Sequence, residues 1–129
     1  MLYTGDVAKV TSFRDLLVWQ KAMVLAAGCY AATRGLKRDD QSVLGFEIRK
    51  SCVSIPSNIA EGFGRHHTAE YVHHLRYANA SGNELQTQLE LAHRAGLMRE
   101  EEVALLVAAA EEVGRMLHGL IASLERGRP

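Results

Sequence analysis

The sequence predicts an all-α protein, an antiparallel up-down-up-down four-helix bundle with left-handed packing. Four long segments repeat apolar residues in steps of three and four, which is the spacing of one helical face. Only two prolines occur in 129 residues, so long helices are permitted. The joints between the segments are about 4–6 residues long, and such short joints place successive helices antiparallel. An apolar period close to 3.5 residues favours shallow left-handed packing.

The first predicted helix follows a stretch without a clear apolar period. Residues 1–12 are therefore expected to form a loose N-terminal arm, and the bundle is expected to span residues 13–126. The first helix is predicted over about residues 13–34, with Gly35 as a stop signal because glycine readily ends a helix. Its stripe, with two aromatic residues expected as core anchors, comprises Leu16, Trp19, Met23, Ala26 and Tyr30.

The second helix is predicted over about residues 40–64. Asp39 or Asp40 can cap its start by accepting backbone hydrogen bonds. Pro56 lies inside this segment and has no N–H to bond four residues back, so a kink or local break is expected near Cys52–Ser54. The apolar stripe of this helix comprises Leu44, Ile48, Cys52, Ile55 and Ile59.

Two further helices complete the predicted bundle. The third is expected over about residues 68–95, with Thr68 as its cap, and the fourth over about residues 100–126. Small residues at Ala78 and Gly82 would let another backbone approach the third helix closely. The third stripe comprises Tyr71, Leu75, Ala78, Gly82, Leu85, Leu89 and Ala92. The fourth stripe comprises Val103, Leu106, Ala110, Val113, Leu117, Leu120 and Leu124.

Two rows of polar residues repeat at helical spacing away from these stripes. The first comprises Glu47, Ser51, Ser54, Asn58, Glu61 and Arg65, and the second comprises Arg76, Asn79, Asn83, Gln86 and Glu90. Solvated faces usually hold more lysine and glutamate and fewer small serine and asparagine residues. The rows are therefore interpreted either as ordinary solvated surface or as hydrogen-bonding contacts with another copy. On the second interpretation, the subunit interface comprises Glu47, Ser51, Ser54, Asn58 and Glu61.

Charge gives no global preference for nucleic acid or an anionic membrane, because 15 basic and 15 acidic side chains cancel. Residues 1–81 hold ten basic and seven acidic side chains, whereas residues 82–129 hold five and eight, so complementary faces between copies are available. Cys29 and Cys52 lie in apolar patterns and are expected as buried free thiols. With no leader pattern and no apolar run of roughly 20 residues, we expect a cytoplasmic protein without membrane contact.

Nucleic-acid binding would need clustered cations, because they must replace the counterions of the phosphates. The candidates are Arg49, Lys50, Arg65 and Arg76, with ordinary solvated charge as the alternative interpretation. No aromatic ladder for stacking bases accompanies them.

The sequence patterns for metal binding and catalysis are weaker than those for nucleic-acid binding. The histidines His66, His67, His73 and His74 lie near Glu70, but one Glu-x-x-His motif is fewer than the two that di-iron bundles use, so surface histidines are favoured. No phosphate-binding glycine loop, dinucleotide fingerprint or activated nucleophile is recognisable. We therefore expect no catalytic residue, metal, cofactor or small-molecule substrate.

Three stretches of the chain point to one protein family. The run from Phe13 to Ala22, FRDLLVWQKA, resembles the opening of four-helix-bundle proteins encoded in intervening sequences of bacterial large-subunit (23S) ribosomal RNA genes. The run from Ser54 to Arg65, SIPSNIAEGFGR, is similar to the most distinctive signature of that family. The run from Tyr71 to Leu85 is similar to its third helix. The resemblance covers about residues 13–98.

The resemblance implies a homo-oligomer, a pentamer in known members, with no established enzymatic activity. A related bundle serves diversity-generating retroelements as an accessory to the reverse transcriptase, in a role linked to nucleic acid. This chain departs from the family at residues 47–51, EIRKS in place of QLRRA, and at residues 78–81, ANAS in place of ARGS. Both departures remove positive charge or add negative charge, which weakens a nucleic-acid role.

These observations lead to three expectations for function. The first is a non-enzymatic, homo-oligomeric interaction or scaffold protein, which rests on the polar rows and the lack of a catalytic pattern. The second is an RNA- or DNA-binding ring that acts with ribosomal RNA or a nucleic-acid enzyme. The third is a metal-binding bundle, which the histidine spacing supports least.

Overall fold

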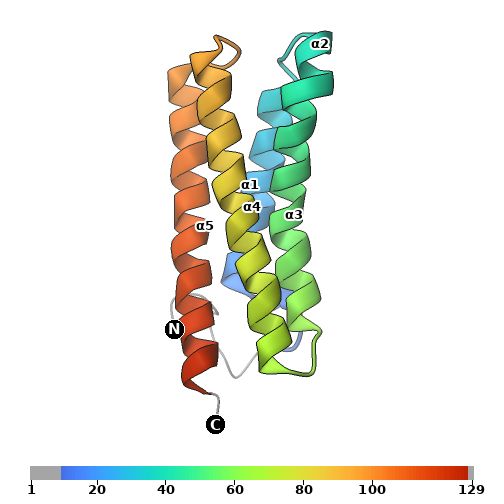
Figure 1. The fold of residues 1–129 in the computed structure, drawn as a ribbon, viewed down its shortest axis with the longest axis vertical. Helices are drawn as coiled ribbons and strands as arrows, with labels where there is room; N and C mark the ends of the chain where they lie inside the picture. The colour runs from blue at the N-terminus through green and yellow to red at the C-terminus, as the bar shows by residue number, and fades with distance from the viewer. Residues whose placement is uncertain (1–9, 128–129) are drawn as a thin grey trace.

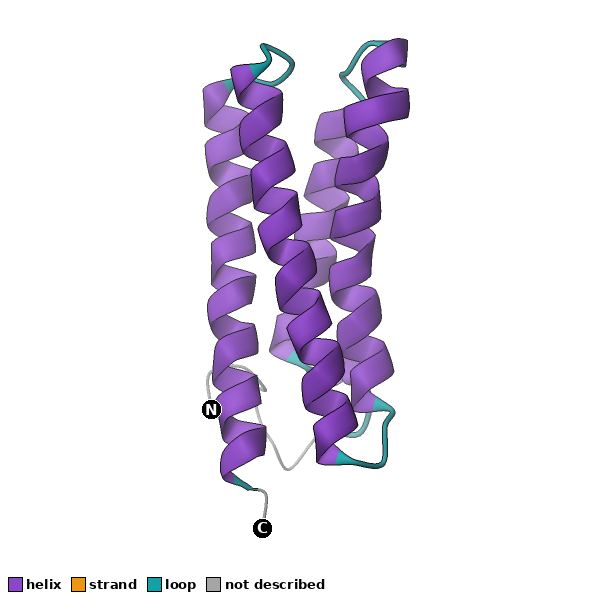
Figure 2. Cartoon of the chain, in the orientation of Figure 1, coloured by secondary structure: helices purple, strands orange, loops and turns teal. Residues whose placement is uncertain are grey.

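The described part of the chain is helical apart from the connections between its helices. A computed structural model describes residues 10–127, and no strand occurs within them. The four long helices are α1 (Leu17–Thr33), α3 (Phe46–Phe63), α4 (Thr68–Arg94) and α5 (Glu100–Arg126). A 3-10 turn (Phe13–Asp15) precedes α1, and the short α2 (Arg38–Asp40) and a π-helical turn (Gln41–Gly45) lead into α3. The predicted all-helical bundle with four long helices is confirmed (Figure 2).

Each long helix packs against two others. Helix α1 contacts α3 and α5, and α4 contacts the same two helices, so α1 and α4 lie at opposite corners of the bundle. The α1–α3 and α4–α5 connections lie at one end of the bundle, and the α3–α4 connection lies at the other (Figure 1). Helices that follow one another in the chain therefore run in opposite directions. The left-handed packing stays a prediction.

The described part of the chain enters the bundle through a capped turn. The hydroxyl of Ser12 accepts from the N–H of Arg14, and the Asp15 carboxylate accepts from the N–H groups of Thr11 and Ser12 at 2.9 and 3.0 Å. The bonds from Thr11 and Ser12 lower the pKa of the Asp15 carboxyl. Of the arm predicted over residues 1–12, residues 1–9 lie outside the described residues, whereas residues 10–12 are held by this turn.

The start of α3 and its proline differ from the expectation. The irregular segment lies at Gln41–Gly45, and Asp39 and Asp40 lie inside the preceding turn without a side-chain cap. Helix α3 continues through Pro56, so the local break predicted near Cys52–Ser54 is absent. Because Pro56 is buried, packing holds the helical path even though one backbone bond is missing. The kink expected at Pro56 stays a prediction.

The core stripe of α1 is the main correction to the predicted core. Most residues of the other three stripes are buried, as expected. In α1, the predicted stripe residues Met23 and Tyr30 are 44% and 40% exposed, and Trp19 is half-buried. The buried residues of α1 are Val18, Ala22, Leu25, Ala26, Cys29 and Thr33. Helix α1 is apolar on nearly every side, so its periodicity singles out no core-facing stripe. Among residues 10–127, no helix is both long and apolar enough to cross a membrane.

Candidate interaction surfaces

The polar row of α3 lies against α4 of the same chain. The hydroxyls of Ser54 and Ser81 are 2.7 Å apart, and Asn58 Nδ2 donates to the backbone oxygen and the hydroxyl of Ser54 at 2.9 and 3.1 Å. Asn58 Oδ1 is 3.1 Å from His74 Nδ1 on α4. Ser51 and Ser81 are buried. We call Ser51, Ser54, Asn58, His74 and Ser81 the α3–α4 seam.

The hydrogen bonds of the seam determine which ring nitrogen of His74 carries a hydrogen toward Asn58. Because Asn58 Nδ2 donates to Ser54, the Asn58 oxygen is left to accept from the Nδ1–H of His74. The other ring nitrogen of His74 lies 3.5 Å from Glu61 Oε2, and the same oxygen is 3.0 Å from Arg65 Nη2. Asn58 and Glu61 are thus linked through His74, and the chain of contacts runs from the α3–α4 seam to the end of α3.

Helices α3 and α4 approach each other closely at a glycine beside the seam. A Cβ atom on Gly62 would lie 2.8 Å from His74 Cβ and 3.2 Å from the backbone oxygen of Tyr71. On Gly82, a Cβ atom would meet nothing within 4 Å, so the close approach expected there is found at Gly62 instead. Tyr71 packs edge-to-face on Phe63 at 6.1 Å, and burial raises the pKa of its phenol to about 12.

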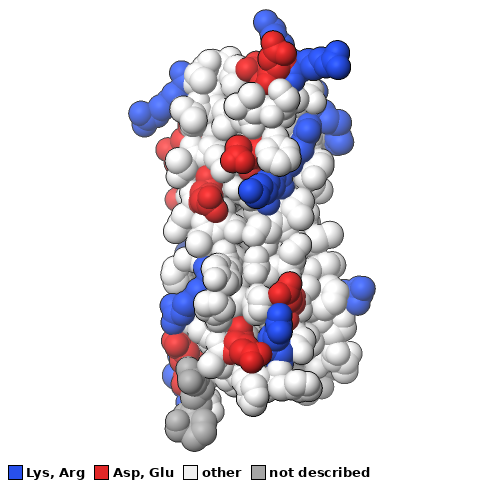
Figure 3. Space-filling view, turned by 45° about the vertical axis from the view of Figure 1, so that its right-hand side comes forward, with Lys and Arg blue, Asp and Glu red and all other residues white. Residues whose placement is uncertain are grey.

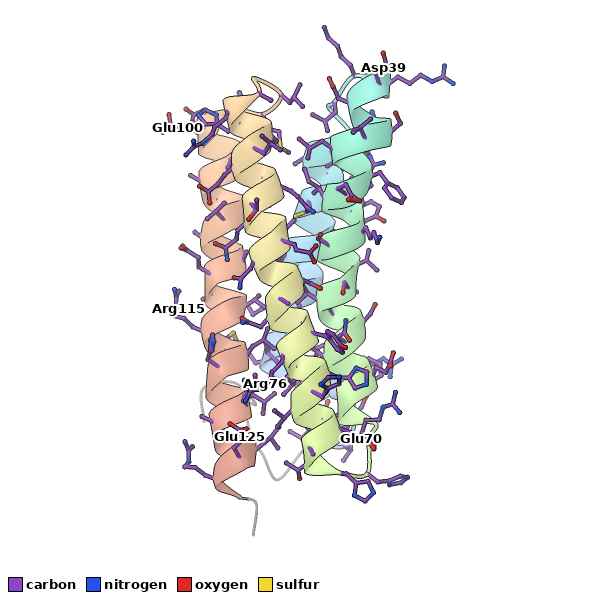
Figure 4. All side chains as sticks on the ribbon, viewed as in Figure 1. Asp39, Glu70, Arg76, Glu100, Arg115 and Glu125 are labelled. Atoms are coloured by element: carbon purple, nitrogen blue, oxygen red, sulfur yellow. The ribbon has the colours of Figure 1, made fainter. Side chains whose placement is uncertain are left out.

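The polar row of α4 lies along α5. Arg76 Nη2 is 3.1 Å from Glu125 Oε2, and Figure 4 shows the two side chains meeting between the helices. Asn79 lies beside Gly114 of α5, because a Cβ atom added to Gly114 would be 3.7 Å from Asn79 Oδ1. Glu90 lines a hollow shared by α4 and α5. Some members of both polar rows therefore lie at contacts between helices of one chain.

The five residues predicted as a subunit interface fall into two groups. The hydrogen-bonding groups of Ser54 and Asn58 have partners within the chain, and Ser51 is buried. Glu47 and Glu61 are exposed, so their contact with another copy stays a prediction. Helix packing within one chain accounts for the small polar residues of the row, because buried polar groups need hydrogen-bond partners.

The four cations considered for nucleic-acid binding do not gather into one patch on the chain. Arg49 Nε donates to Thr33 Oγ1 at 2.9 Å and thus points toward α1, whereas Lys50 lines a hollow on the α4 side of α3. Arg65 and Arg76 each form the ion pair described above. Figure 3 shows acidic and basic side chains interspersed on the face that it presents, with an uncharged band across the middle.

The histidines near the α3–α4 connection line an open hollow of about 420 Å³. Its lining comprises Arg65, Ala69, Glu70, His73 and His74. The rings of His73 and Tyr77 pack edge-to-face at 4.6 Å, and His66 and His67 are exposed. Between Val10 and Gly127, no group of three or more His, Cys, Asp or Glu side chains is placed to hold a metal ion.

The two cysteines join α1 to α3 in the core. Cys29 and Cys52 are buried free thiols, as predicted. The hydrogen bond with Cys52, together with burial, raises the pKa of the Cys29 thiol. The thiolate is the nucleophilic form of cysteine, so Cys29 is held in its unreactive form.

An apolar surface without a partner in the described chain lies on α1 and beside α3. A groove of about 370 Å³ runs between the two helices, and we call it the α1–α3 groove; it is lined by Trp19, Met23, Ala26, Val53, Pro56, Ser57 and Ala60. Val24, which lies on the outer side of α1, is 71% exposed. The sequence held a signal for this surface, because α1 is apolar on nearly every side and such a helix is normally buried all round.

Comparisons with known proteins bear on the fold and the family. A family model described as "23S rRNA-intervening sequence protein" matches residues 14–119. A crystal structure of a protein with unknown function from the S23 ribosomal protein family of Bacteroides thetaiotaomicron is similar, with a TM-score of 0.75 and 24% identity. The match covers 81% of this chain and 97% of that chain, and at this identity it shows the fold alone. No curated protein matches the chain.

Proposed function

The chain belongs to the 23S rRNA-intervening sequence protein family, and we propose that it is a non-enzymatic cytoplasmic interaction protein that assembles with copies of itself. One observation carries the proposal: α1 is apolar on nearly every side, yet its outer side and its groove with α3 are open to solvent in a single chain. The resemblance to the family implies five copies in the assembly, and we adopt that number.

Burial of the α1 surface would supply the free energy of assembly. Met23, Val24, Tyr30 and Val53 are large apolar side chains that are each at least 40% exposed there. Full burial of such a side chain contributes about 1.5–3 kcal/mol. Contiguous apolar surface on a soluble protein marks an interaction site, whereas scattered single residues do not. The side chains of Ser54 and Asn58 at the α3–α4 contact already have partners within the chain, so they do not require a second copy.

Light scattering after size-exclusion chromatography tests this proposal. At micromolar concentration we expect a mass about fivefold the 14.2 kDa of one chain. Met23→Glu places a charge in the α1–α3 groove and is expected to give the mass of one chain, because an unpaired charge is costly to bury. Leu91→Glu is the matched control, because Leu91 is 52% exposed but lies on α4, away from the groove. Its mass should equal that of the wild type.

Two results would contradict self-association through α1. A wild-type protein with the mass of one chain would remove the proposal altogether. A Met23→Glu variant that keeps the full mass would show that copies meet through another surface. Circular dichroism of each variant separates a change of assembly from a loss of the fold.

The same experiment separates self-association from nucleic-acid binding. Structured RNA added at low salt, where the electrostatic attraction is strongest, is expected to leave the mass unchanged. A gain in mass would favour the RNA- or DNA-binding ring instead. Charge reversal at Arg49, Lys50, Arg65 and Arg76 would then locate the binding surface.

A further inference from the structure

We propose that the α1–α3 groove of one copy receives the outer face of α5 from a second copy, in a head-to-tail contact. The inference rests on the proposed self-association and adds which surface of the partner fills the groove. The outer face of α5 is the set of residues that helical spacing places opposite its buried stripe: Glu101, Leu105, Ala108, Glu112 and Arg115. Figure 4 shows Arg115 pointing away from the bundle.

Leu105 is the apolar centre of this face. It is 74% exposed, which is the highest value among the large apolar side chains of the described residues. Ala104 and Ala108 are exposed beside it, and Glu101 and Glu112 flank the apolar stretch along the helix. A single exposed leucine is ordinary on a protein surface. The proposal therefore depends on how this leucine and its flanking charges match the groove.

An ion pair within the chain shows which residues of α1 and α5 lie at the same height along the bundle axis. Lys21 Nζ is 3.6 Å from Glu112 Oε1, so these residues lie at one level. The two helices run in opposite directions with about 1.5 Å rise per residue, so Leu105 is level with Gly28. A contact supports this register, because a Cβ atom on Gly28 would lie 3.1 Å from Leu106 Cδ2.

The groove offers apolar partners at the level of Leu105. Gly28 lies between Met23 and Tyr30 along α1; Met23 lines the groove, and the ring of Tyr30, which is 40% exposed, lies 5.5 Å from the guanidinium of Arg49 on α3. On α3, the Nε of Arg49 bonds to Thr33 at 2.9 Å, so Arg49 lies at the height of the end of α1. Val53 follows Arg49 by about one helical turn, which places it close to the height of Gly28 and Leu105. A second copy standing parallel to the first therefore brings its leucine opposite the apolar part of the groove.

The same register aligns opposite charges. Glu101 lies about 16 Å beyond Glu112 toward the start of α5, which is the level of the C-terminal end of α1. Arg34 follows that end, and Arg49 is bound there to Thr33. Within residues 10–127, neither arginine forms an ion pair and neither does Glu101. The parallel arrangement places the Glu101 carboxylate of one copy beside the guanidinium groups of Arg34 and Arg49 of the next, and within the described residues neither arginine has an acidic partner.

A head-to-tail contact matches these charges better than a contact of two identical grooves. Two grooves facing each other would leave Leu105 and Glu101 in solvent and would set no carboxylate against Arg34 or Arg49. The groove lies on the α1–α3 side and the α5 face lies at a neighbouring corner of the bundle, so they are not on opposite sides. Successive copies therefore turn in one direction, and a head-to-tail contact of this kind forms a ring where the rotation closes.

Disulfide trapping with two cysteine variants tests the contact. Val53→Cys and Leu105→Cys are refolded separately and as a 1:1 mixture, and each is oxidised with diamide and run on a denaturing gel. We expect a cross-linked dimer only in the mixture, and a ladder up to the size of the ring in the double variant. Leu91→Cys, refolded with Val53→Cys, is the control that should not cross-link. The wild type sets the background, because Cys29 and Cys52 are both buried.

The outcomes distinguish this inference from the proposed function. A single-chain mass for the wild type would overturn self-association itself. An oligomer in which either single variant cross-links with itself would show a contact of identical surfaces and overturn the head-to-tail arrangement. An oligomer whose mixture gives no cross-link would place the partner surface elsewhere.

A charge exchange gives a second, independent measurement. Arg34→Glu and Glu101→Arg are each expected to raise the dissociation constant about three- to tenfold at low salt, since they set like charges together at the rim. The double variant should recover wild-type affinity. Additive losses in the double variant would show that the two side chains do not meet.

Discussion

The two flanks of α3 differ in chemistry and in whether they have a partner. Toward α4, Ser54 and Asn58 bond to each other and to side chains of α4 across the α3–α4 seam. Toward α1, Val53 and Pro56 line an apolar groove that stays open. Polar groups that leave water need partners at once, so the chain supplies them itself. The comparison teaches that the polar flank marks a contact already made within the chain, whereas the apolar flank is the one that the proposed self-association would cover.

The largest expected change in the free energy of unfolding tests how closely α3 and α4 pack beside the seam. Gly62→Ala would bring a Cβ within 2.8 Å of His74 Cβ and 3.2 Å of the Tyr71 backbone oxygen. Backbone atoms cannot rotate away, so we expect the free energy of unfolding to fall by about 1–3 kcal/mol. Urea unfolding measures it, in a Met23→Glu background so that dissociation of copies does not enter.

Gly82→Ala is the matched control within α4. A Cβ atom there meets nothing within 4 Å, and alanine is the better helix former. The free energy of unfolding should rise by about 0.5–1 kcal/mol. If Gly62→Ala were as mild as Gly82→Ala, the two helices would not be in close contact at Gly62, and the seam would be looser than the geometry indicates.

A second prediction contrasts neighbouring positions on the two flanks. Asn58→Ala leaves the Nδ1–H of His74 without its acceptor and removes the side-chain donor to the hydroxyl of Ser54, so the free energy of unfolding should fall by about 1–2 kcal/mol. Val53→Ser faces the open groove and should change it by no more than about 0.5 kcal/mol. Urea unfolding of both variants in the Met23→Glu background gives the comparison. A large loss for Val53→Ser would mean that the groove is already closed within one chain.

The same pair separates assembly from folding. Light scattering of the variants without the Met23→Glu change should show the wild-type mass for Asn58→Ala and a weaker assembly for Val53→Ser. The reverse result would place the subunit contact on the polar row, as the subunit-interface interpretation of the sequence predicts. The two flanks can therefore be told apart by two measurements on the same proteins.

The fold could be predicted from sequence wherever a helix has one apolar face. Residues such as Ile48, Leu75 and Leu117 recur at helical spacing among polar neighbours, and they are buried. Helix α1 lacks this contrast, so the predicted stripe through Met23 and Tyr30 faces the groove while Val18 and its neighbours fill the core. Periodicity identifies a buried face only when the opposite face is polar.

The candidate site could be predicted only in part, for a different reason. The spacing of Ser54 and Asn58 shows that a polar row exists but not what it contacts, because solvent, another helix and a second copy would select the same spacing. The hydroxyl that Ser54 meets is Ser81, 27 residues away in the chain. Such a pairing depends on how α3 and α4 are aligned, which a single sequence does not encode at any one position.

The last expected effect is a pH dependence of stability, which depends on Tyr71 beside the seam and leaves stability near neutral pH unchanged. Burial raises the pKa of Tyr71 from 10.0 to about 12, so the fold favours the neutral phenol. This contribution to stability is fully present below about pH 10, where both states are protonated, and is lost as the pH rises toward about 12. Tyr71→Phe keeps the ring against Phe63 and removes the ionisation.

Urea unfolding of both proteins between about pH 9 and about pH 12 measures the difference. Other groups that titrate in this range are common to the two proteins and cancel in the comparison. The wild type should lose stability relative to the phenylalanine variant as the pH rises, with no divergence below about pH 10. Parallel curves over the whole range would show that water reaches the Tyr71 hydroxyl. The α3–α4 seam would then be open beside Gly62, and the contrast between the two flanks of α3 would be weaker at that end.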